Sequence, residues 1–309
     1  MESELKKNRK NGSQTSSFGT KSRINHDSSK FYDGKLYSEL TVNRCKLTDN
    51  QLYPNENPIP PNLVNSVIVG SSEKMVEIPD NSIHLMVTSP PYNVSKDYDN
   101  DLSLEEYIQF LQSVFTETYR VLVKGGRACI NVANLGRKPY IPLSDYISKM
   151  MIKIGFSMRG EIIWNKGAGA GVSMAWGSWI SASNPVLRDT HEYILIFSKD
   201  SFSREAKNRE NTITKEQFME WTKSVWTFNP ESAKKIGHPA PFPEELPYRL
   251  IQLYTFKDDI ILDPFMGSGT TGLVAVKNER KFVGYEVNEE YVELSNKRIK
   301  AELSQLKLF

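Results

Sequence analysis

The chain has 309 residues and a nearly balanced charge, with 39 basic and 37 acidic residues. Its length predicts one large domain or two ordinary ones, and a net charge of +2 is unlike that of a histone-like protein. No apolar run approaches the roughly 18 residues of a membrane span. Cys45 and Cys129 are too far apart in sequence for a zinc motif or a disulfide framework. We expect a soluble protein of a reducing compartment, either an enzyme or a nucleic-acid-binding module.

The positive charge is concentrated at the start of the chain. Residues 1–30 hold seven basic and three acidic residues, whereas the rest of the chain holds 32 basic and 34 acidic residues. Residues 1–35 are rich in Ser, Asn, Gly and Lys and lack periodic apolar residues, which is typical of disorder. Two interpretations stay open for this tail: an arm that contacts phosphates, or a solvated segment.

Seven apolar runs further along the chain, several of them bounded by turn residues, predict buried strands. They are residues 67–69, 83–87, 127–132, 160–164, 192–197, 260–262 and 281–285. Helices are expected between them. Ser103 and Glu106 form a capping box before a periodic stretch, and residues 143–154 and 243–254 have helical spacing. This alternation of strands and helices predicts an α/β fold with a mainly parallel sheet.

The middle of the chain interrupts the alternation. Residues 165–190 are rich in Gly, Ser and Trp, and we expect a long loop there; such loops are often functional in compact domains. Residues 199–235 are polar and charged with embedded aromatic residues, which predicts a small insertion.

A turn with unusual chemistry follows the strand predicted at residues 83–87, with the sequence TSPPYN at residues 88–93. Its two prolines fix φ and remove two N–H donors, which leaves a stiff turn rich in acceptors. The Ser89 hydroxyl and the backbone carbonyls suit an exocyclic NH2 group, and the Tyr92 ring suits a stacked base. The alternative is a loop that the prolines merely stiffen. The candidate catalytic residues are Ser89, Pro90, Pro91 and Tyr92.

A glycine-rich turn near the C-terminus has the pattern strand, tight turn, helix, strand. Gly267 and Gly269 allow close approach of a ligand, and Glu286 ends the next strand, where it can accept both hydroxyls of a ribose. The lysine of an ATP-binding loop is missing. Asp263 is awkward beside a pyrophosphate but suits a cationic amino-acid moiety, as in S-adenosylmethionine. The candidate cofactor-binding residues from this pattern are Asp263, Gly267, Gly269 and Glu286.

Together, TSPPY at residues 88–92 and DPFMGSGTT at residues 263–271 resemble the motifs of the DNA amino-methyltransferases, which methylate N4 of cytosine or N6 of adenine. The resemblance covers residues 60–300. The catalytic motif precedes the cofactor motif, an order similar to that of the circularly permuted β class. It implies an S-adenosylmethionine-dependent, Rossmann-like fold with helices on both faces of the sheet. It also adds four motif residues to the candidate cofactor-binding residues: Phe265, Ser268, Thr270 and Thr271. One departure is Gly70-Ser71-Ser72, where the family usually has an acidic residue near the adenine.

The resemblance also implies a division of the chain. After the tail at residues 1–35 come a catalytic half at 36–164, a target-recognition insertion at 165–237 and a cofactor-binding half at 238–309. Because Arg pairs with guanine edges and Lys with phosphates, the candidate DNA contacts are Arg188, Arg204, Lys207 and Arg209. The four histidines show no metal-ligand spacing, so no metal is expected.

The implied reaction is direct methyl transfer from S-adenosylmethionine to the exocyclic amine of a base flipped out of duplex DNA. In the family, Ser at the first motif position favours N4 of cytosine. The alternatives are N6 of adenine, a non-catalytic DNA-binding module, and an amine methyltransferase of RNA or protein. The implied partners are double-stranded DNA, a cognate restriction endonuclease and a second copy of the chain. A bacterial or archaeal protein of this kind is expected in the cytoplasm, at the nucleoid.

Overall fold

The computed structural model describes residues 56–92, 102–136, 138–167, 177–206, 208–231 and 242–306. These residues all belong to one compact unit, Pro54–Phe309. The predicted tail at residues 1–35 lies outside the described residues, as does the DNA-contact candidate Lys207.

The centre of the described unit is a single eight-stranded sheet with the order β1-β8-β7-β2-β3-β5-β4-β6. Its strands are β1 (Ser66–Val69), β2 (Ile83–Thr88), β3 (Leu122–Val132), β4 (Ser157–Asn165), β5 (His191–Ser198), β6 (Val225–Thr227), β7 (Ile260–Asp263) and β8 (Lys281–Glu286). All neighbours pair in parallel except β5, which is antiparallel to both β3 and β4. The seven predicted strands and the mainly parallel sheet are confirmed; the short strand β6 was not predicted.

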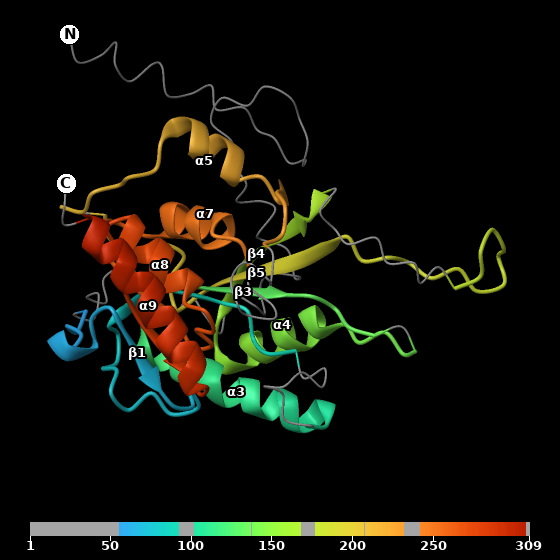
Figure 1. The fold of residues 1–309 in the computed structure, drawn as a ribbon, viewed down its shortest axis with the longest axis horizontal. Helices are drawn as coiled ribbons and strands as arrows, with labels where there is room; N and C mark the ends of the chain where they lie inside the picture. The colour runs from blue at the N-terminus through green and yellow to red at the C-terminus, as the bar shows by residue number, and fades with distance from the viewer. Residues whose placement is uncertain are drawn as a thin grey trace, which may run out of the picture. The chain divides into compact units, whose positions relative to one another are not determined.

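Helices cover both faces of the sheet (Figure 1). One core contains buried side chains of α3 (Leu104–Val121) and α4 (Leu143–Ile154), including Phe115 and Ile147. The other contains side chains of α5 (Lys215–Trp221), α7 (Glu245–Tyr254), α8 (Thr270–Lys277) and α9 (Glu289–Leu306). A short 3-10 helix, η2 (Pro61–Leu63), precedes β1. The predicted capping box is present: the Ser103 hydroxyl accepts from the Glu106 N–H, and the Ser103 N–H donates to the Glu106 carboxylate.

The predicted insertion is built onto the same sheet. Trp226 lies in β6, which pairs with β4 and forms the edge of the sheet, and Trp221 ends α5. Both indole rings are buried, with 1% and 7% of their surfaces exposed, so they belong to the core. The boundaries of the recognition insertion at 165–237 stay a prediction.

One edge of the sheet gathers the residues of interest. The parallel strands β1, β8, β7, β2 and β3 all end there, and antiparallel β5 begins there. The neighbours β2 and β7 are separated by about half of the chain, yet their last residues, Thr88 and Asp263, are joined by a hydrogen bond. In open α/β sheets, ligands bind outside this carboxyl edge where the strand order reverses.

Candidate active site

The turn after β2 is held by contacts from two other elements. The Tyr107 hydroxyl of α3 donates to the carbonyl of Pro91 at 2.7 Å, and the N–H of Ala133 donates to the Tyr92 hydroxyl at 3.2 Å. The hydroxyls of Ser89 and Tyr92 are 3.4 Å apart. Ser89 is half-buried at the end of a fully buried strand. The turn is therefore a fixed structure that leaves one hydroxyl partly accessible.

The Tyr92 side chain stays a neutral phenol. Burial raises the pKa of Tyr92 well above its ordinary value, and the nearby Glu192 carboxylate raises it further. A neutral ring with one satisfied hydroxyl is suited to stacking against a base, because it brings no charge to the contact.

A polar network that the sequence did not predict lies beside this turn. The Asn131 amide of β3 donates to the Glu192 carboxylate of β5 at 2.6 Å, and the Lys166 ammonium pairs with the other oxygen of that carboxylate at 2.5 Å. Asn131 follows directly after Ile130, which is paired with Thr88, so it is next to Ser89 across the sheet. The buried Asn131 Oδ1 atom has no hydrogen-bond partner among the described residues.

Asp263 does not have the predicted role of contacting a cationic ligand. Its side chain is covered by protein, with 1% exposed, rather than presented to a cationic ligand. One carboxylate oxygen accepts from the Thr88 hydroxyl at 2.6 Å and from the Phe265 N–H at 3.1 Å, and the other accepts from the Thr271 hydroxyl at 2.7 Å. Burial raises the pKa of Asp263 to about 6, although these hydrogen bonds oppose the shift. Asp263 therefore fastens the catalytic turn to the glycine-rich turn.

The glycine-rich turn is shaped by Glu286. The N–H of Gly267, which has a left-handed backbone with φ 50°, donates to the Glu286 carboxylate at 2.8 Å, and the N–H of Asn288 donates to its other oxygen at 2.9 Å. Gly269 is also a position that only glycine can occupy, because a Cβ there would lie 2.6 Å from the Ser295 side chain of α9. Gly269 thus allows helix α9 to pack on the turn.

The remaining predicted cofactor residues of this turn are packed against other parts of the protein. Ser268, Thr270 and Thr271 are buried. The Arg298 guanidinium of α9 donates to the Ser268 carbonyl, and the Phe265 ring packs on Phe110 of α3 with 5.8 Å between centroids. These contacts fix the turn between α3 and α9.

The residues present fit an adenosyl ligand. Glu286 is half-buried at the end of β8, where a carboxylate can accept ribose hydroxyls. Gly70, at the end of the neighbouring β1, has no protein atom within 4 Å of where a Cβ would stand. Two residues after Gly70, the Ser72 hydroxyl donates to the Pro264 carbonyl at 2.9 Å and ties this loop to the glycine-rich turn. A half-buried carboxylate that can accept ribose hydroxyls, with open space beside it, therefore fits a nucleoside.

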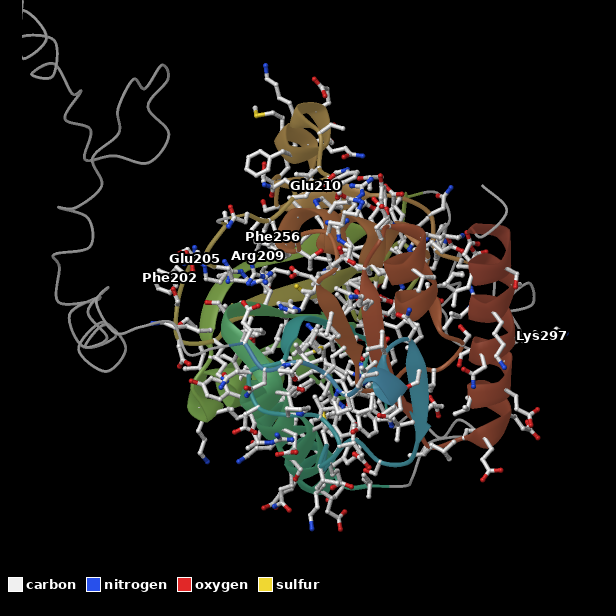
Figure 2. The ribbon with its side chains drawn as sticks, turned by 90° about the vertical axis from the view of Figure 1, so that its left-hand side faces the viewer. Phe202, Glu205, Arg209, Glu210, Phe256 and Lys297 are labelled. Carbon is white, nitrogen blue, oxygen red and sulfur yellow. The ribbon has the colours of Figure 1, made fainter. Side chains whose placement is uncertain are left out.

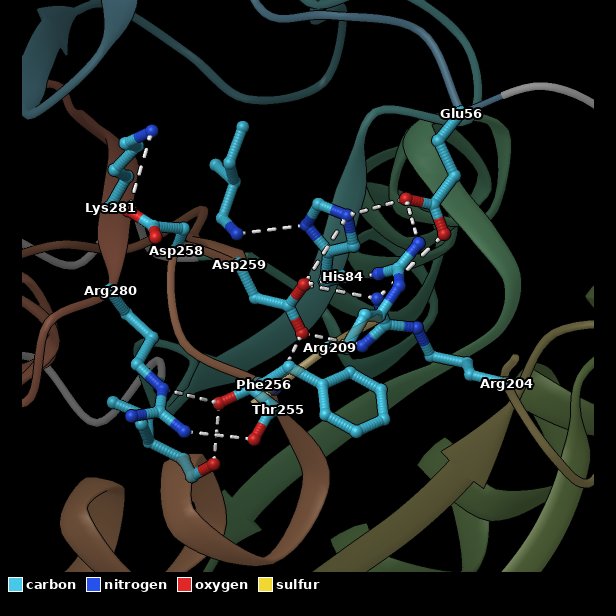
Figure 3. Close-up of polar contacts among 12 residues, drawn as sticks. Glu56, His84, Arg204, Arg209, Thr255, Phe256, Asp258, Asp259, Arg280 and Lys281 are labelled. Atoms are coloured by element: carbon cyan, nitrogen blue, oxygen red, sulfur yellow. Dashed lines mark hydrogen bonds and ion pairs between the residues drawn. The ribbon is translucent and has the colours of Figure 1, made fainter. Parts of the chain in front are cut away.

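Two of the four predicted DNA contacts are engaged elsewhere (Figure 3). Arg204 has a side chain that is 6% exposed and pairs with the Asp259 carboxylate at 2.6 Å. Arg209 pairs with the Glu56 carboxylate at 2.6 Å, and the His84 ring contacts that carboxylate at 3.1 Å. Burial of this cluster gives Arg204 a structural role and corrects the prediction that it contacts DNA.

This cluster of ion pairs also lies at the edge of the sheet opposite Ser89, where a contact with DNA bound at Ser89 is not expected. His84 is near the start of β2 and Asp259 directly precedes β7, so both are at the amino edge, opposite Ser89. The Arg204 and Arg209 guanidiniums lie 5.3 and 5.7 Å from the Phe256 ring centroid. Figure 2 shows Arg209 next to Phe256 on one flank of the molecule, far from Lys297 of α9. Arg188 is exposed in the loop before β5, and its contact with DNA stays a prediction.

A mainly parallel sheet with a half-buried carboxylate at the end of β8 and a Pro-Pro-Tyr turn at the end of β2, on the far side of β7, has the arrangement of an S-adenosylmethionine-dependent methyltransferase. More narrowly, the chain belongs to the N6/N4 DNA methylase family, whose model matches residues 83–297. Within the described part of the chain, no helix is long and apolar enough to cross a membrane.

Individual relatives agree with this family. The Type II methyltransferase M.MjaI of Methanocaldococcus jannaschii is 32% identical over 285 residues, which cover 75% of this chain and 92% of the relative. The DNA adenine methyltransferase YhdJ of Escherichia coli (strain K12) is 29% identical over 243 residues, with coverages of 73% and 79%. TTHA0409 of Thermus thermophilus, solved in complex with S-adenosyl-L-methionine, superposes with a TM-score of 0.63 at 28% identity and covers 77% of this chain and 93% of its own.

Proposed function

We propose that the protein methylates the exocyclic N4 amine of a cytosine flipped out of duplex DNA, within one recognition site. The cytosine assignment is carried by Ser89, because a serine at the head of the Pro-Pro-Tyr turn favours N4 of cytosine in this family. Its hydroxyl stands where other members place a carboxylate or an amide. The half-buried position of Ser89 and its fixed turn support a direct contact with the amine.

The turn can activate the amine without a charged base. The lone pair of an exocyclic amine is conjugated with the ring, so methylation requires the nitrogen to become more tetrahedral. In this proposal the Ser89 hydroxyl and the Pro90 carbonyl accept its two N–H bonds, which turns the lone pair towards the methyl donor. Tyr107 already occupies the Pro91 carbonyl, and a proline offers no competing N–H. The acceleration comes from positioning and from fixed dipoles.

The cofactor side of the site is held by the glycine-rich turn. Bound S-adenosylmethionine supplies an electrophilic methyl group on a sulfonium. In this proposal Glu286 accepts the ribose hydroxyls, and the bond from the Gly267 N–H to Glu286 supports it by keeping the backbone of the turn close to that carboxylate. Asp263 fixes the distance between this turn and Ser89, because it is bonded to both Thr88 and Thr271. The two turns are thus presented as one rigid unit.

A second candidate is methylation of N6 of adenine. It is favoured by the relative YhdJ, a DNA adenine methyltransferase that matches 73% of this chain. Both amines present two N–H bonds, so the two acceptors beside Ser89 are chemically suited to either base.

Nucleoside analysis of methylated DNA separates the two candidates. DNA incubated with the protein and S-adenosylmethionine is digested to nucleosides and resolved by mass spectrometry, with Ser89→Ala protein as the matched control. We expect N4-methylcytosine from the wild-type protein only. N6-methyladenine would refute the cytosine assignment. Methyl groups found in RNA or protein but not in DNA would refute the DNA substrate.

The proposed setting is a restriction-modification system in the cytoplasm. It is supported by the Type II methyltransferase M.MjaI, with 32% identity to this chain. A cognate restriction endonuclease and a homodimeric state belong to the same proposal. The pairing with an endonuclease would be tested by asking whether the methylated DNA is protected from an endonuclease of the same site. The homodimeric state would be tested by analytical ultracentrifugation.

A further inference from the structure

The loop between β4 and β5 leaves the sheet at the catalytic edge. Asn165, the last residue of β4, pairs with His191, the first residue of β5. Along β5, Tyr193 pairs with Val132 of β3, two residues after the Ile130 that pairs with Thr88. The described part of this loop, residues 177–190, reaches away from the sheet as the long yellow segment in Figure 1. The base of this loop therefore lies at the same edge of the sheet as Ser89, with β3 between β5 and the strand that carries Ser89.

The far part of the loop is a closed hairpin-like tip. Gly177 and Pro185 form an antiparallel bridge, and the Ser178 N–H donates to the Asn184 carbonyl at 2.8 Å. The Asn184 N–H in turn donates to the Ser178 hydroxyl at 2.9 Å, and that hydroxyl donates to the Ser181 carbonyl at 2.6 Å. A Cβ at Gly177 would lie 2.2 Å from the Asn184 carbonyl oxygen, so only glycine permits this closure. The tip, Gly177–Pro185, is therefore a built structure.

The apex of the tip presents large apolar side chains to solvent. Trp179 is 66% exposed and Ile180 is 86% exposed. Ile180 also has a left-handed backbone with φ 50°, which is uncommon for a β-branched residue. The hydrogen bonds of the tip thus hold two apolar side chains outward at its end.

The chemistry around the apex matches nucleic acid. The tip itself contains three serine hydroxyls, one asparagine amide and no carboxylate, and the pair Arg188 and Asp189 follows it. Such a surface can approach phosphates without repulsion, and its donors can bond to them. DNA-bending proteins insert apolar side chains between base steps, and an enzyme that flips a base must disturb the stack at that point. The apex combines an apolar wedge with a surface that accepts a polyanion, on a loop that leaves the catalytic edge.

We propose that the Gly177–Pro185 tip enters the DNA base stack next to the target base, with Trp179 and Ile180 contacting the bases. The insertion lowers the cost of moving the target base out of the duplex. This inference rests on DNA as the substrate and on base flipping, and it holds for either target base.

Two duplexes that differ only at the target pair test the insertion. Both carry the site found by sequencing DNA that the protein has methylated; one is fully paired, and the other has an abasic position opposite the target base. For Trp179→Ala/Ile180→Ala we expect kcat/KM to fall roughly tenfold or more on the paired duplex, in line with the loss of base stacking on an aromatic ring. On the second duplex, where the base is already unpaired, we expect a loss below about threefold, because flipping costs least there.

The matched control is Tyr146→Ala/Ile152→Ala, which removes one aromatic and one isoleucine side chain, 41% and 40% exposed, from α4. We expect it to leave both rates within about twofold of wild type. Thermal unfolding midpoints and S-adenosylmethionine affinities of all proteins are compared to exclude misfolding.

Three results would overturn the inference while the wild-type protein still methylates DNA. They are an unchanged rate of the tip variant on the paired duplex, equal losses on both duplexes, and conversion of a dimer into monomers, which would make the apex a contact between copies. If the wild-type protein transfers no methyl group to DNA, the proposed function fails and the inference fails with it.

Discussion

The buried carboxylate of Asp263 makes stability depend on pH in a direction opposite to that of a paired surface carboxylate. Burial raises its pKa from 3.8 to about 6. Well below its unfolded pKa of 3.8, the carboxyl group is protonated in both the folded and the unfolded chain, so its contribution to stability is fully present. As the pH rises through 6, the folded state must hold a buried charge that the unfolded state exposes to water. One pKa unit corresponds to 1.36 kcal/mol, so this group alone lowers the free energy of unfolding by about 2 kcal/mol between pH 4 and pH 7.

The replacement Asp263→Asn keeps the shape of the side chain and removes its titration. We would measure urea unfolding of both proteins between pH 4 and pH 7 and compare the extrapolated free energies of unfolding. The wild-type value minus the variant value is expected to fall by about 2 kcal/mol over this range. With Thr271→Val, which removes one bond that opposes the shift, the fall should be larger. A difference that stays constant with pH would refute the assignment of a raised pKa to Asp263.

Three further predictions concern the site and the buried cluster. Ser89→Ala should lower kcat about 100-fold, as the loss of one aligned polar group typically does, and leave the S-adenosylmethionine Kd unchanged in calorimetry; loss of cofactor binding would contradict the role of Ser89. Glu286→Gln should raise that Kd about tenfold, because a charged acceptor is lost; an unchanged Kd would exclude a ribose contact. Arg204→Met should lower the free energy of unfolding by about 3 kcal/mol in chemical unfolding, because the buried Asp259 carboxylate then loses its closest partner. The DNA affinity of the folded variant should be unchanged; weaker DNA binding would show that Arg204 contacts DNA.

The central strands and two long helices could be predicted because their signals are local. Runs of apolar residues mark strands that are buried on both faces, as in β2, and Ser103 marks the start of α3 by its own cap. The unpredicted elements lack such signals. Strand β6 has three residues and α5 has seven, which is too short for a period to emerge. Helix α9 buries only a narrow stripe that includes Val292 and Ile299 within a charged sequence.

In the candidate site, too, only the features with a local signal in the sequence could be predicted. The two motifs could be recognised because each is a contiguous run of residues, and the structure brings them to adjacent strand ends. The role of Asp263 could not be predicted, because its partner Thr88 lies 175 positions earlier. The network beside Ser89 was missed for the same reason: Asn131 and Glu192 are 61 positions apart. Arg204 was misassigned because a cationic residue in a polar segment has the same local signature whether it faces solvent or a buried carboxylate.

The ion-pair cluster of Arg204 and Arg209 has a consequence for exchanging recognition regions between relatives. A chimaera joined at residue 199 would remove both arginines and leave Asp259 and Glu56 facing one another across His84 without their cations. A chimaera joined after Arg209 keeps the whole cluster and still replaces α5 and β6. Downstream of β5, the part of the middle region that can be exchanged with another member of the family without breaking this cluster therefore begins beyond Arg209.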